Sequence, residues 1–126
     1  MLNNTSLQPC ILIVEDEPRI ASFLERGLRR YGYKTVTTDR GDCALDLVLA
    51  NGFDLMLLDL GLPGKDGWAV LDEMQVAQSH VPVIVITAKE GVGDRIGQYS
   101  STVLGYMMKP FRLGVLIDMI RDQLTP

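Results

Sequence analysis

The chain has 126 residues, of which 47% are hydrophobic and 22% charged, and its formal net charge is -4 at pH 7. This length and composition are typical of one globular domain with its own core. The acidic balance argues against a nucleic-acid-binding surface on this segment, and the apolar stretches are far shorter than the roughly 20 residues that span a membrane. We therefore expect a cytoplasmic domain without membrane or direct nucleic-acid contacts.

The first residues of the chain lack the basic and apolar regions of a secretory signal. We predict a disordered lead over residues 1–9 and a single domain over residues 10–126. Cys10 and Cys43 fall in a strand-like and a helix-like stretch, so we expect two small buried thiols rather than a disulfide. The single histidine, His80, has no metal-binding partner nearby in the sequence and is expected in a loop.

Five apolar runs of strand length recur along the chain, at residues 10–16, 34–39, 54–60, 82–88 and 105–109. The segments that follow them carry apolar residues at helical spacing. The first helix is expected to begin at Pro18 and end at Gly32, because proline suits a first helical turn and glycine ends a helix. The second helix covers residues 42–51 and ends at Gly52, and the third begins after Gly67.

Three of the expected helices have a face that we predict to be buried. These faces contain Ile20, Phe23, Leu24, Gly27, Leu28 and Tyr31 in the first helix, Val70, Leu71, Met74 and Ala77 in the third, and Leu113, Leu116, Ile117, Ile120 and Leu124 in the last. Residues 91–101 hold three glycines and few apolar anchors. The helix there is expected to be short or mobile.

The alternation of strand and helix, repeated five times, predicts an α/β fold with a parallel sheet covered on both faces. The runs "ILIV", "LMLL" and "VIVI" are apolar at every position, as strands buried on both sides are. Right-handed crossovers bring the carboxyl ends of all the strands to one edge of the sheet, where ligands of such sheets bind.

Acidic residues follow two of the expected strands at that edge. Glu15, Asp16 and Glu17 end the first strand, and Asp59 ends the third. Glu17 is expected to turn away into the first helix, where an acid favours the helix dipole. Asp16, Asp59 and at least one neighbour then converge, and a cluster of carboxylates without His or Cys selects Mg²⁺, or alternatively Mn²⁺ or Ca²⁺.

Two further strands of that edge, the fourth and the fifth, end in residues that suit phosphoryl transfer. Lys109 supplies a fixed positive charge, Thr87 a hydroxyl donor, and Ala88 is small enough to leave the site accessible. A metal and an ammonium would neutralise the oxygens of a phosphoryl group while the Asp59 carboxylate attacks in line.

Each of these residues also has an ordinary structural interpretation. Asp59 could be a loop acid or helix cap, Glu15 and Asp16 a solvated strand end, Thr87 a strand former and Lys109 a surface lysine. Their position at the ends of four different strands, all at the predicted ligand edge, favours a shared site.

Four sequence blocks, "ILIVEDEP", "DLMLLDLGLPGKDG", "PVIVITA" and "GYMMKPF", occur in the order and spacing of one known family. Over residues 10–124 the chain resembles a response-regulator receiver domain of two-component signalling. The resemblance implies a flavodoxin-like (βα)5 fold with strand order 2-1-3-4-5. It also implies a cytoplasmic switch that receives its phosphoryl group from a partner histidine kinase or phosphotransfer protein.

The resemblance assigns roles to individual residues. It implies Asp59 as the phosphoacceptor, and Glu15, Asp16, Asp59 and the backbone carbonyl of Gly61 as Mg²⁺ ligands. It places Thr87, Ala88 and Lys109 around the phosphoryl group, with a cis peptide bond before Pro110. Thr87 and Tyr106 would form the switch that reshapes the face made by residues 91–101, the strand at 105–109 and the last helix.

That output face departs from the family pattern. Residues 102–106 read "TVLGY" where many relatives read "GADDY", so Thr102 replaces a glycine and Leu104-Gly105 replace an acidic pair. Homodimerisation through this face is an open prediction, since Arg121 fits the charged pattern of relatives that dimerise there, whereas Met119 and Leu104 do not. Gly61 and Lys89 are expected to flank the path of attacking water.

Two other classes of function remain as alternatives. The same fold could serve as a constitutive docking platform, or as an ordinary enzyme or cofactor carrier. The loop "EDEP" after the first strand is acidic and blocked by proline, unlike a phosphate-binding loop, which disfavours a nucleotide or flavin protein. The arginines of the first helix, Arg19, Arg26, Arg29 and Arg30, are either a kinase-docking face or a solvated helix exterior.

Overall fold

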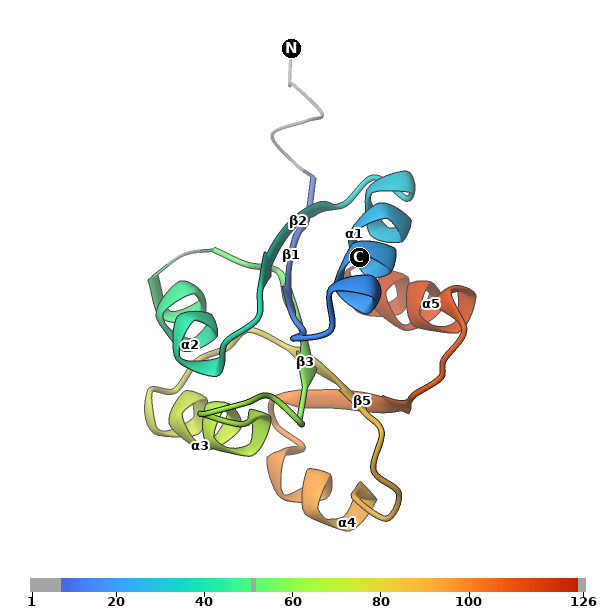
Figure 1. Ribbon diagram of the computed structural model, residues 1–126. Helices are drawn as coiled ribbons and strands as arrows, with labels where there is room; N and C mark the ends of the chain where they lie inside the picture. The colour runs from blue at the N-terminus through green and yellow to red at the C-terminus, as the bar shows by residue number, and fades with distance from the viewer. Residues whose placement is uncertain (1–7, 51, 125–126) are drawn as a thin grey trace.

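Five parallel strands form one sheet in the order β2-β1-β3-β4-β5, as expected for a flavodoxin-like (βα)5 fold (Figure 1). A computed structural model describes residues 8–50 and 52–124. Most of the predicted lead, residues 1–7, together with Asn51 at the end of the predicted second helix and the last two residues of the predicted domain, lies outside the described residues. The strands are β1 (Cys10–Val14), β2 (Lys34–Thr38), β3 (Leu55–Asp59), β4 (Val83–Thr87) and β5 (Val103–Met108).

Helices cover both faces of the sheet. They are α1 (Pro18–Arg30), α2 (Gly41–Ala50), α3 (Gly67–Val76), α4 (Gly93–Ile96), a 3₁₀ turn η2 (Gly97–Tyr99) and α5 (Leu113–Leu124). In Figure 1, α1 and α5 lie on one side of the sheet, and α2, α3 and α4 lie on the other. Among the described residues, no helix has the length and apolarity of a membrane span.

The central strands are apolar at every position because each face of the sheet has its own core. Ile11, Ile13 and Leu57 pack with residues of α1 and α5. The alternating residues, such as Leu12 and Leu58, pack with α2 and α3 on the other side. Successive side chains of a strand point to opposite faces, so a strand covered on both sides has no position for a polar residue until it ends.

The predicted faces of α5 and most of α3 are confirmed, but three predicted core residues are wrong. Phe23 is 45% exposed, and Tyr31 is 47% exposed and lies at the C-cap of α1 rather than within the helix. Ala77 is exposed because α3 ends one residue earlier and Ala77 is its C-cap. Periodicity gives the direction of a helix face but not how far its neighbour covers it.

The predictions for Cys10 and His80 agree with the structure, whereas the predicted burial of Cys43 does not. Cys10 and Cys43 are both free, as expected. Cys10 is partly buried, but the prediction of a buried Cys43 is wrong, since this residue lies on the exposed side of α2. His80 lies in the exposed loop before β4, as predicted.

The segment after β4 is short, as its glycines predict. α4 has four residues and continues as a 3₁₀ turn of three. Its buried side chains are Val92, Ile96 and Tyr99, all in the core on the α2–α3 side. Within α4 itself only Ile96 is buried, so the packing of this helix depends on its N-cap Val92 and on Tyr99 of η2.

Residues 102–106, which depart from the family pattern, lie at the start of β5. Val103 pairs with Val83 and Gly105 pairs with Ile84, so Leu104 is an extra residue at a β-bulge. Its side chain is 45% exposed. A Cβ atom on Gly105 would lie 2.9 Å from Cε of Met119 in α5, so Gly105 leaves the space that Met119 occupies.

Candidate functional site

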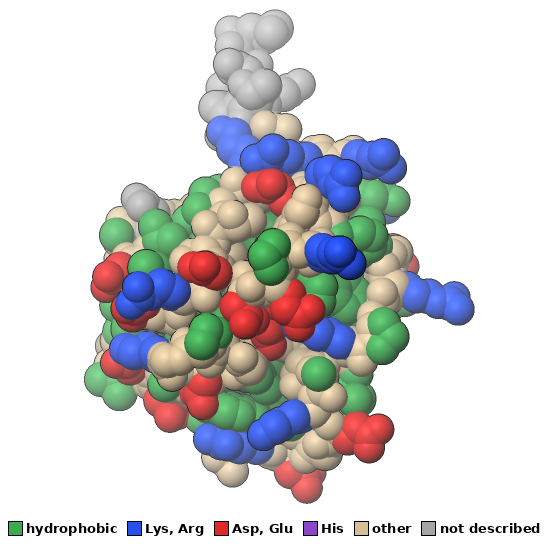
Figure 2. Space-filling view, in the orientation of Figure 1, with side chains coloured by type: hydrophobic (Ala, Val, Ile, Leu, Met, Phe, Trp, Pro, Cys, Tyr) green, Lys and Arg blue, Asp and Glu red, His purple; other side chains and the backbone are tan. Residues whose placement is uncertain are grey.

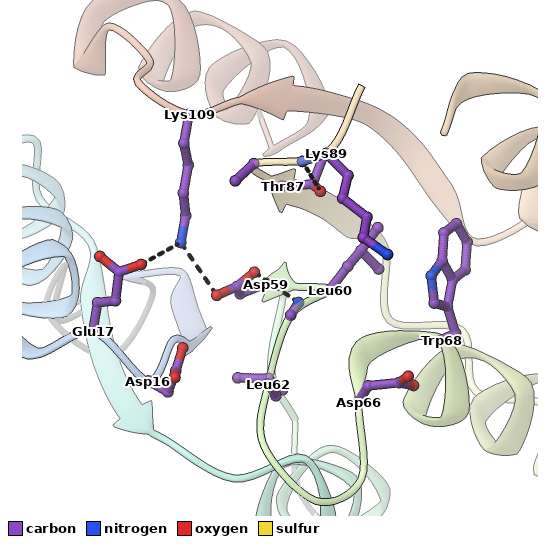
Figure 3. Close-up of a pocket in the computed structure, with 12 residues that line it drawn as sticks. Asp16, Glu17, Asp59, Leu60, Leu62, Asp66, Trp68, Thr87, Lys89 and Lys109 are labelled. Carbon is purple, nitrogen blue, oxygen red and sulfur yellow. Dashed lines mark hydrogen bonds and ion pairs between the residues drawn. The ribbon is translucent and has the colours of Figure 1, made fainter. Parts of the chain in front are cut away.

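The ends of β1, β3, β4 and β5 surround one pocket, at the edge of the sheet that the strand pattern predicted. The pocket has a volume of about 380 Å³, and residues from all four strand ends line it (Figure 3). Figure 2 shows Asp and Glu side chains gathered near the centre of this face of the molecule. Asp59, the last residue of β3, lies in the pocket wall with only 5% of its surface exposed.

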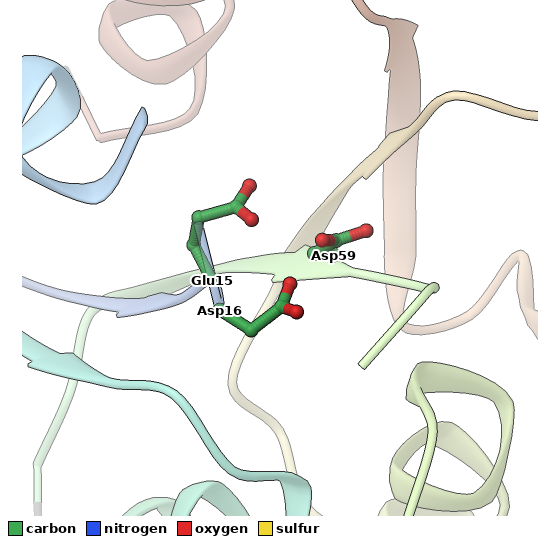
Figure 4. Close-up of side chains that lie close together, drawn as sticks. All are labelled: Glu15, Asp16 and Asp59. Carbon is green, nitrogen blue, oxygen red and sulfur yellow. The ribbon is translucent and has the colours of Figure 1, made fainter. Parts of the chain in front are cut away.

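Three carboxylates meet at this point. One oxygen from each of Glu15, Asp16 and Asp59 lies within 4.8 Å of the others (Figure 4). Backbone groups orient two of them, since the Gly61 N–H donates to Oδ1 of Asp59 at 2.9 Å and the Glu17 N–H donates to Oε2 of Glu15 at 3.1 Å. The three acids predicted to bind a metal are therefore together.

The ammonium of Lys109 balances this negative charge. Its Nζ lies 3.2 Å from Oδ2 of Asp59 and 2.9 Å from Oε1 of Glu15. Burial on its own would lower the pKa of Lys109, but the contacts with Glu15 and Asp59 outweigh it and the pKa is raised. The lysine therefore remains charged at neutral pH.

Glu17 also faces the site, contrary to expectation. It is the N-cap of α1, but its side chain does not bond to the helix and its Oε1 lies 3.6 Å from Nζ of Lys109. The buried ammonium attracts this exposed carboxylate more than the amino end of the helix does. The prediction that Glu17 turns away from the site is wrong.

Two features of the Glu15 carboxyl group, its raised pKa and the surroundings of its Oε1 oxygen, fit a binding site for a cation. Burial raises the pKa of Glu15 to about 7, against the lowering effect of Lys109. Among residues 8–50 and 52–124, Oε1 of Glu15 is a buried side-chain oxygen without a hydrogen-bond partner, and its ion-pair contact with Lys109 does not have hydrogen-bond geometry. Three carboxylates that meet around one point, two of them in contact with the same ammonium, suit a hard divalent ion such as Mg²⁺.

Thr87, at the end of β4, is buried beside Asp59. Its Oγ1 accepts a hydrogen bond from the Lys89 N–H at 3.0 Å, so its own hydroxyl proton is free to be donated. The Lys109 N–H donates to the Thr87 carbonyl at 2.8 Å and joins the two strand ends. Ala88 lies next to them in the exposed lining of the pocket, where a small side chain leaves the entrance open.

Tyr106 and Pro110 lie on β5 and just beyond it. The Tyr106 side chain is 43% exposed, and its hydroxyl would be 3.1 Å from a Cβ atom placed on Gly93, so the ring lies over the start of α4. The Lys109–Pro110 peptide bond is cis, as the sequence resemblance implied.

The loop after β3 reaches the pocket through a close contact that the sequence analysis did not anticipate. Asp66 caps α3 by accepting a hydrogen bond from the Ala69 N–H at 3.0 Å. A Cβ atom on Gly67 would lie 2.7 Å from Cα of Leu60, so a glycine is needed for α3 to start this close to the end of β3. This contact places Trp68 in the pocket wall, together with Leu62 and Asp66. The "DGW" sequence after the acidic strand end was the available signal.

A buried carboxylate, an acidic triad, a lysine and a threonine at the ends of parallel strands define a phosphoacceptor domain of the receiver type. The family model described as "Response regulator receiver domain" matches residues 11–121. The chain belongs to this family and is a receiver domain of two-component response regulators.

Named relatives and solved structures agree with this assignment. The chain is 38% identical over 112 residues to the transcriptional activator protein IrlR of Burkholderia pseudomallei, an alignment that covers 89% of this chain and 48% of IrlR. The chain thus spans about half the length of the curated relatives it matches.

Two solved structures to which the chain is similar contain magnesium. The receiver domain of the sensor histidine kinase PA1611 from Pseudomonas aeruginosa, with a magnesium ion coordinated in its active site cleft, matches with a TM-score of 0.83 and 28% identity over 94% of this chain and 99% of that one. The response regulator TrrA from Thermotoga maritima, in complex with Mg²⁺-BeF, matches with a TM-score of 0.82 and 29% identity over 93% and 100% of the two chains.

Proposed function

We propose that Asp59 accepts a phosphoryl group in a Mg²⁺-dependent reaction and that this event switches the face formed by α4, β5 and α5. The observation that carries the proposal is the contact of the buried Asp59 carboxylate with Lys109, inside a cluster of three carboxylates. Membership of the receiver family supports the same reaction.

The reaction follows from the positions of the side chains. A carboxylate oxygen of Asp59 forms a bond to phosphorus while the bond to the donor breaks, and the electron pair of that bond leaves with the donor, which for a phosphohistidine is the imidazole nitrogen. Lys109 and Thr87 lie beside Asp59 and would hold the oxygens of the transferred group by charge and by a donated hydrogen bond. One charge pair near 4 Å contributes about 4 kcal/mol at an effective dielectric of 20.

A magnesium ion would be held by Glu15, Asp16, Asp59 and the carbonyl of Gly61. When bound, it would neutralise charge on the phosphoryl oxygens. The three carboxylates fit this role by their spacing, and the magnesium bound in two structural neighbours supports the choice of ion.

The partner is proposed to be a histidine kinase or a phosphotransfer protein, and the domain is proposed to catalyse only its own phosphorylation and dephosphorylation. Homodimerisation, the absence of nucleic-acid contacts, a cytoplasmic location and the domain boundary at residues 10–126 stay predictions. Arg121, which was expected on the dimer face, lies with its guanidinium carbon 4.9 Å from the ring centroid of Tyr31, the C-cap residue of α1.

The decisive experiment compares Asp59→Asn with Asp54→Asn. Asp54 lies before β3, where its side chain accepts a hydrogen bond from the Cys10 N–H, so its replacement makes the same chemical change outside the pocket. With acetyl phosphate and Mg²⁺, intact-mass measurement should show one added phosphoryl group on the wild type and on Asp54→Asn, and none on Asp59→Asn. Labelling of Asp59→Asn at the wild-type level would disprove the assignment.

Beryllofluoride separates a switch from a constitutive docking platform. A switch should show amide chemical-shift changes in α4 and β5 when beryllofluoride and Mg²⁺ are added. A docking platform should show changes confined to the residues that line the pocket.

A further inference from the structure

Trp68 belongs both to the wall of the pocket and to a contact between two helices. It is the second residue of α3, it is partly buried, and its ring lies beside the Lys89 side chain in the pocket (Figure 3). The guanidinium carbon of Arg95, in α4, lies 4.0 Å from the centroid of the Trp68 ring. The ring of Tyr99 follows in η2, with its centroid 5.9 Å from that of Trp68.

A hydrogen bond strengthens the same contact. The buried Tyr99 donates its hydroxyl proton to Oδ1 of Asp72, one turn along α3 from Trp68. We call the four residues Trp68, Asp72, Arg95 and Tyr99 the α3–α4 clamp. It contains a cation–π contact, an aromatic pair and a charge-assisted hydrogen bond, and all three join α3 to the α4–η2 segment.

The clamp matters because little else holds α4. The helix has four residues, and in the described part of the segment its apolar anchors are Val92, Ile96 and Tyr99. Tyr99 is itself a member of the clamp. A large share of the packing of this segment therefore depends on α3 side chains that start at the pocket wall.

The connection from the pocket to α4 is also short. Thr87 ends β4, and Oγ1 of Thr87 is bonded to the Lys89 N–H in the loop that leads to Gly93. A phosphoryl group on Asp59 would draw the Thr87 hydroxyl and the Lys89 ammonium toward new negative charge. Displacement of this loop would move Arg95 and Tyr99 relative to Trp68, which is fixed by the start of α3.

We propose that the α3–α4 clamp holds α4 in the arrangement of the unphosphorylated domain and that occupation of the pocket has to loosen it. Trp68 is then a positioning residue through which the pocket and α4 influence each other. The proposal rests on the proposed phosphorylation of Asp59. Because the clamp stabilises the arrangement without a bound phosphoryl group, its removal should increase the population that is ready to bind one.

The test is a titration with beryllofluoride in the presence of Mg²⁺. Arg95→Gln and Tyr99→Phe each remove one contact of the clamp. Each should lower the half-saturating beryllofluoride concentration by about three- to fivefold relative to the wild type. Arg26→Gln, on the exposed side of α1, is the matched control and should leave it unchanged.

The readout is direct because Trp68 is the single tryptophan of the chain. Its emission should change on titration of the wild type, and Arg95→Gln should give part of this change before any ligand is added. Amide chemical shifts of residues 93–99 give an independent measure of the same equilibrium.

The outcomes separate this inference from the function on which it rests. If the wild type does not respond to beryllofluoride and Mg²⁺, both the proposed function and the clamp are wrong. If the wild type responds but Arg95→Gln has the same or a higher half-saturating concentration, the clamp proposal alone is wrong, even where thermal stability has dropped. Should Tyr99→Phe fail to fold, Arg95→Gln decides, since its side chain is exposed.

Discussion

At the scale of single residues, Glu15 is the acid whose protonation depends most on folding. Its carboxyl group is buried, and the pKa rises from 4.5 to about 7. Between these two values the folded domain binds a proton that the unfolded chain has already released. The free energy of unfolding therefore falls as the pH rises through this range, and this contribution levels off above about pH 7.

We predict that Glu15→Gln removes this part of the pH dependence. In the absence of Mg²⁺, urea denaturation of the wild type should show stability falling between pH 5 and 7, relative to Glu15→Gln, by at most about 1.4 kcal/mol per pH unit. Added Mg²⁺ should reduce the difference, since the ion binds the charged carboxylate. If the free energy of unfolding varied with pH in the same way for the two proteins over this range, the pKa of Glu15 would not be raised by folding.

At the scale of secondary-structure elements, the junction of β3 and α3 controls the shape of the pocket. Gly67 allows the first turn of α3 to lie against the backbone of Leu60 and Asp59. Trp68 and Asp66 reach the pocket because of this contact. A larger residue would have to move the strand end that carries Asp59, the proposed phosphoacceptor.

We predict that Gly67→Ala destabilises the domain by about 1–3 kcal/mol through overpacking. Gly97→Ala is the matched control, because a Cβ atom there meets nothing within 4 Å and the φ of -57° suits any residue. This control should be neutral or stabilise by about 0.4–1 kcal/mol. Equal midpoints for the two variants in urea denaturation would contradict the packing argument.

At the scale of the whole molecule, stability is distributed unevenly around the sheet. The central strands β1 and β3 have neighbours on both edges and helices on both faces, whereas α4 and η2 depend on a few side chains. Opening of residues 92–100 therefore exposes little buried surface.

We predict that the amides of residues 92–100 exchange with solvent at a lower opening free energy than those of β1 and β3. Native-state hydrogen exchange measures both sets in one experiment. Exchange of α4 at the global unfolding free energy would show that the segment is as firmly held as the sheet, and would contradict the assignment of α4 as the weak element.

The fold was predictable because the sequence patterns that determine it lie within single strands and helices. Apolar runs such as "ILIV" and "VIVI" require burial on both sides, and their alternation with helices then leads to one sheet edge with Asp59 and Lys109 on it. Other features depend instead on how distant segments of the chain pack together. They are the contact of Glu17 with Lys109, the exposure of Phe23 and the contact of Arg95 with Trp68. A single sequence gives the direction of a side chain from its element, but not the neighbour that it meets.

The fit of Gly105 against Met119 has a practical consequence for anyone who redesigns the surface formed by β5 and α5. A graft of the family's acidic pair at residues 104 and 105 would push a new side chain into the terminal methyl group of Met119. The contact is with the free end of a flexible side chain, so Met119 has to turn aside before residue 105 can carry a side chain. Sequence swaps confined to the fifth strand should therefore also change the position of a side chain on α5.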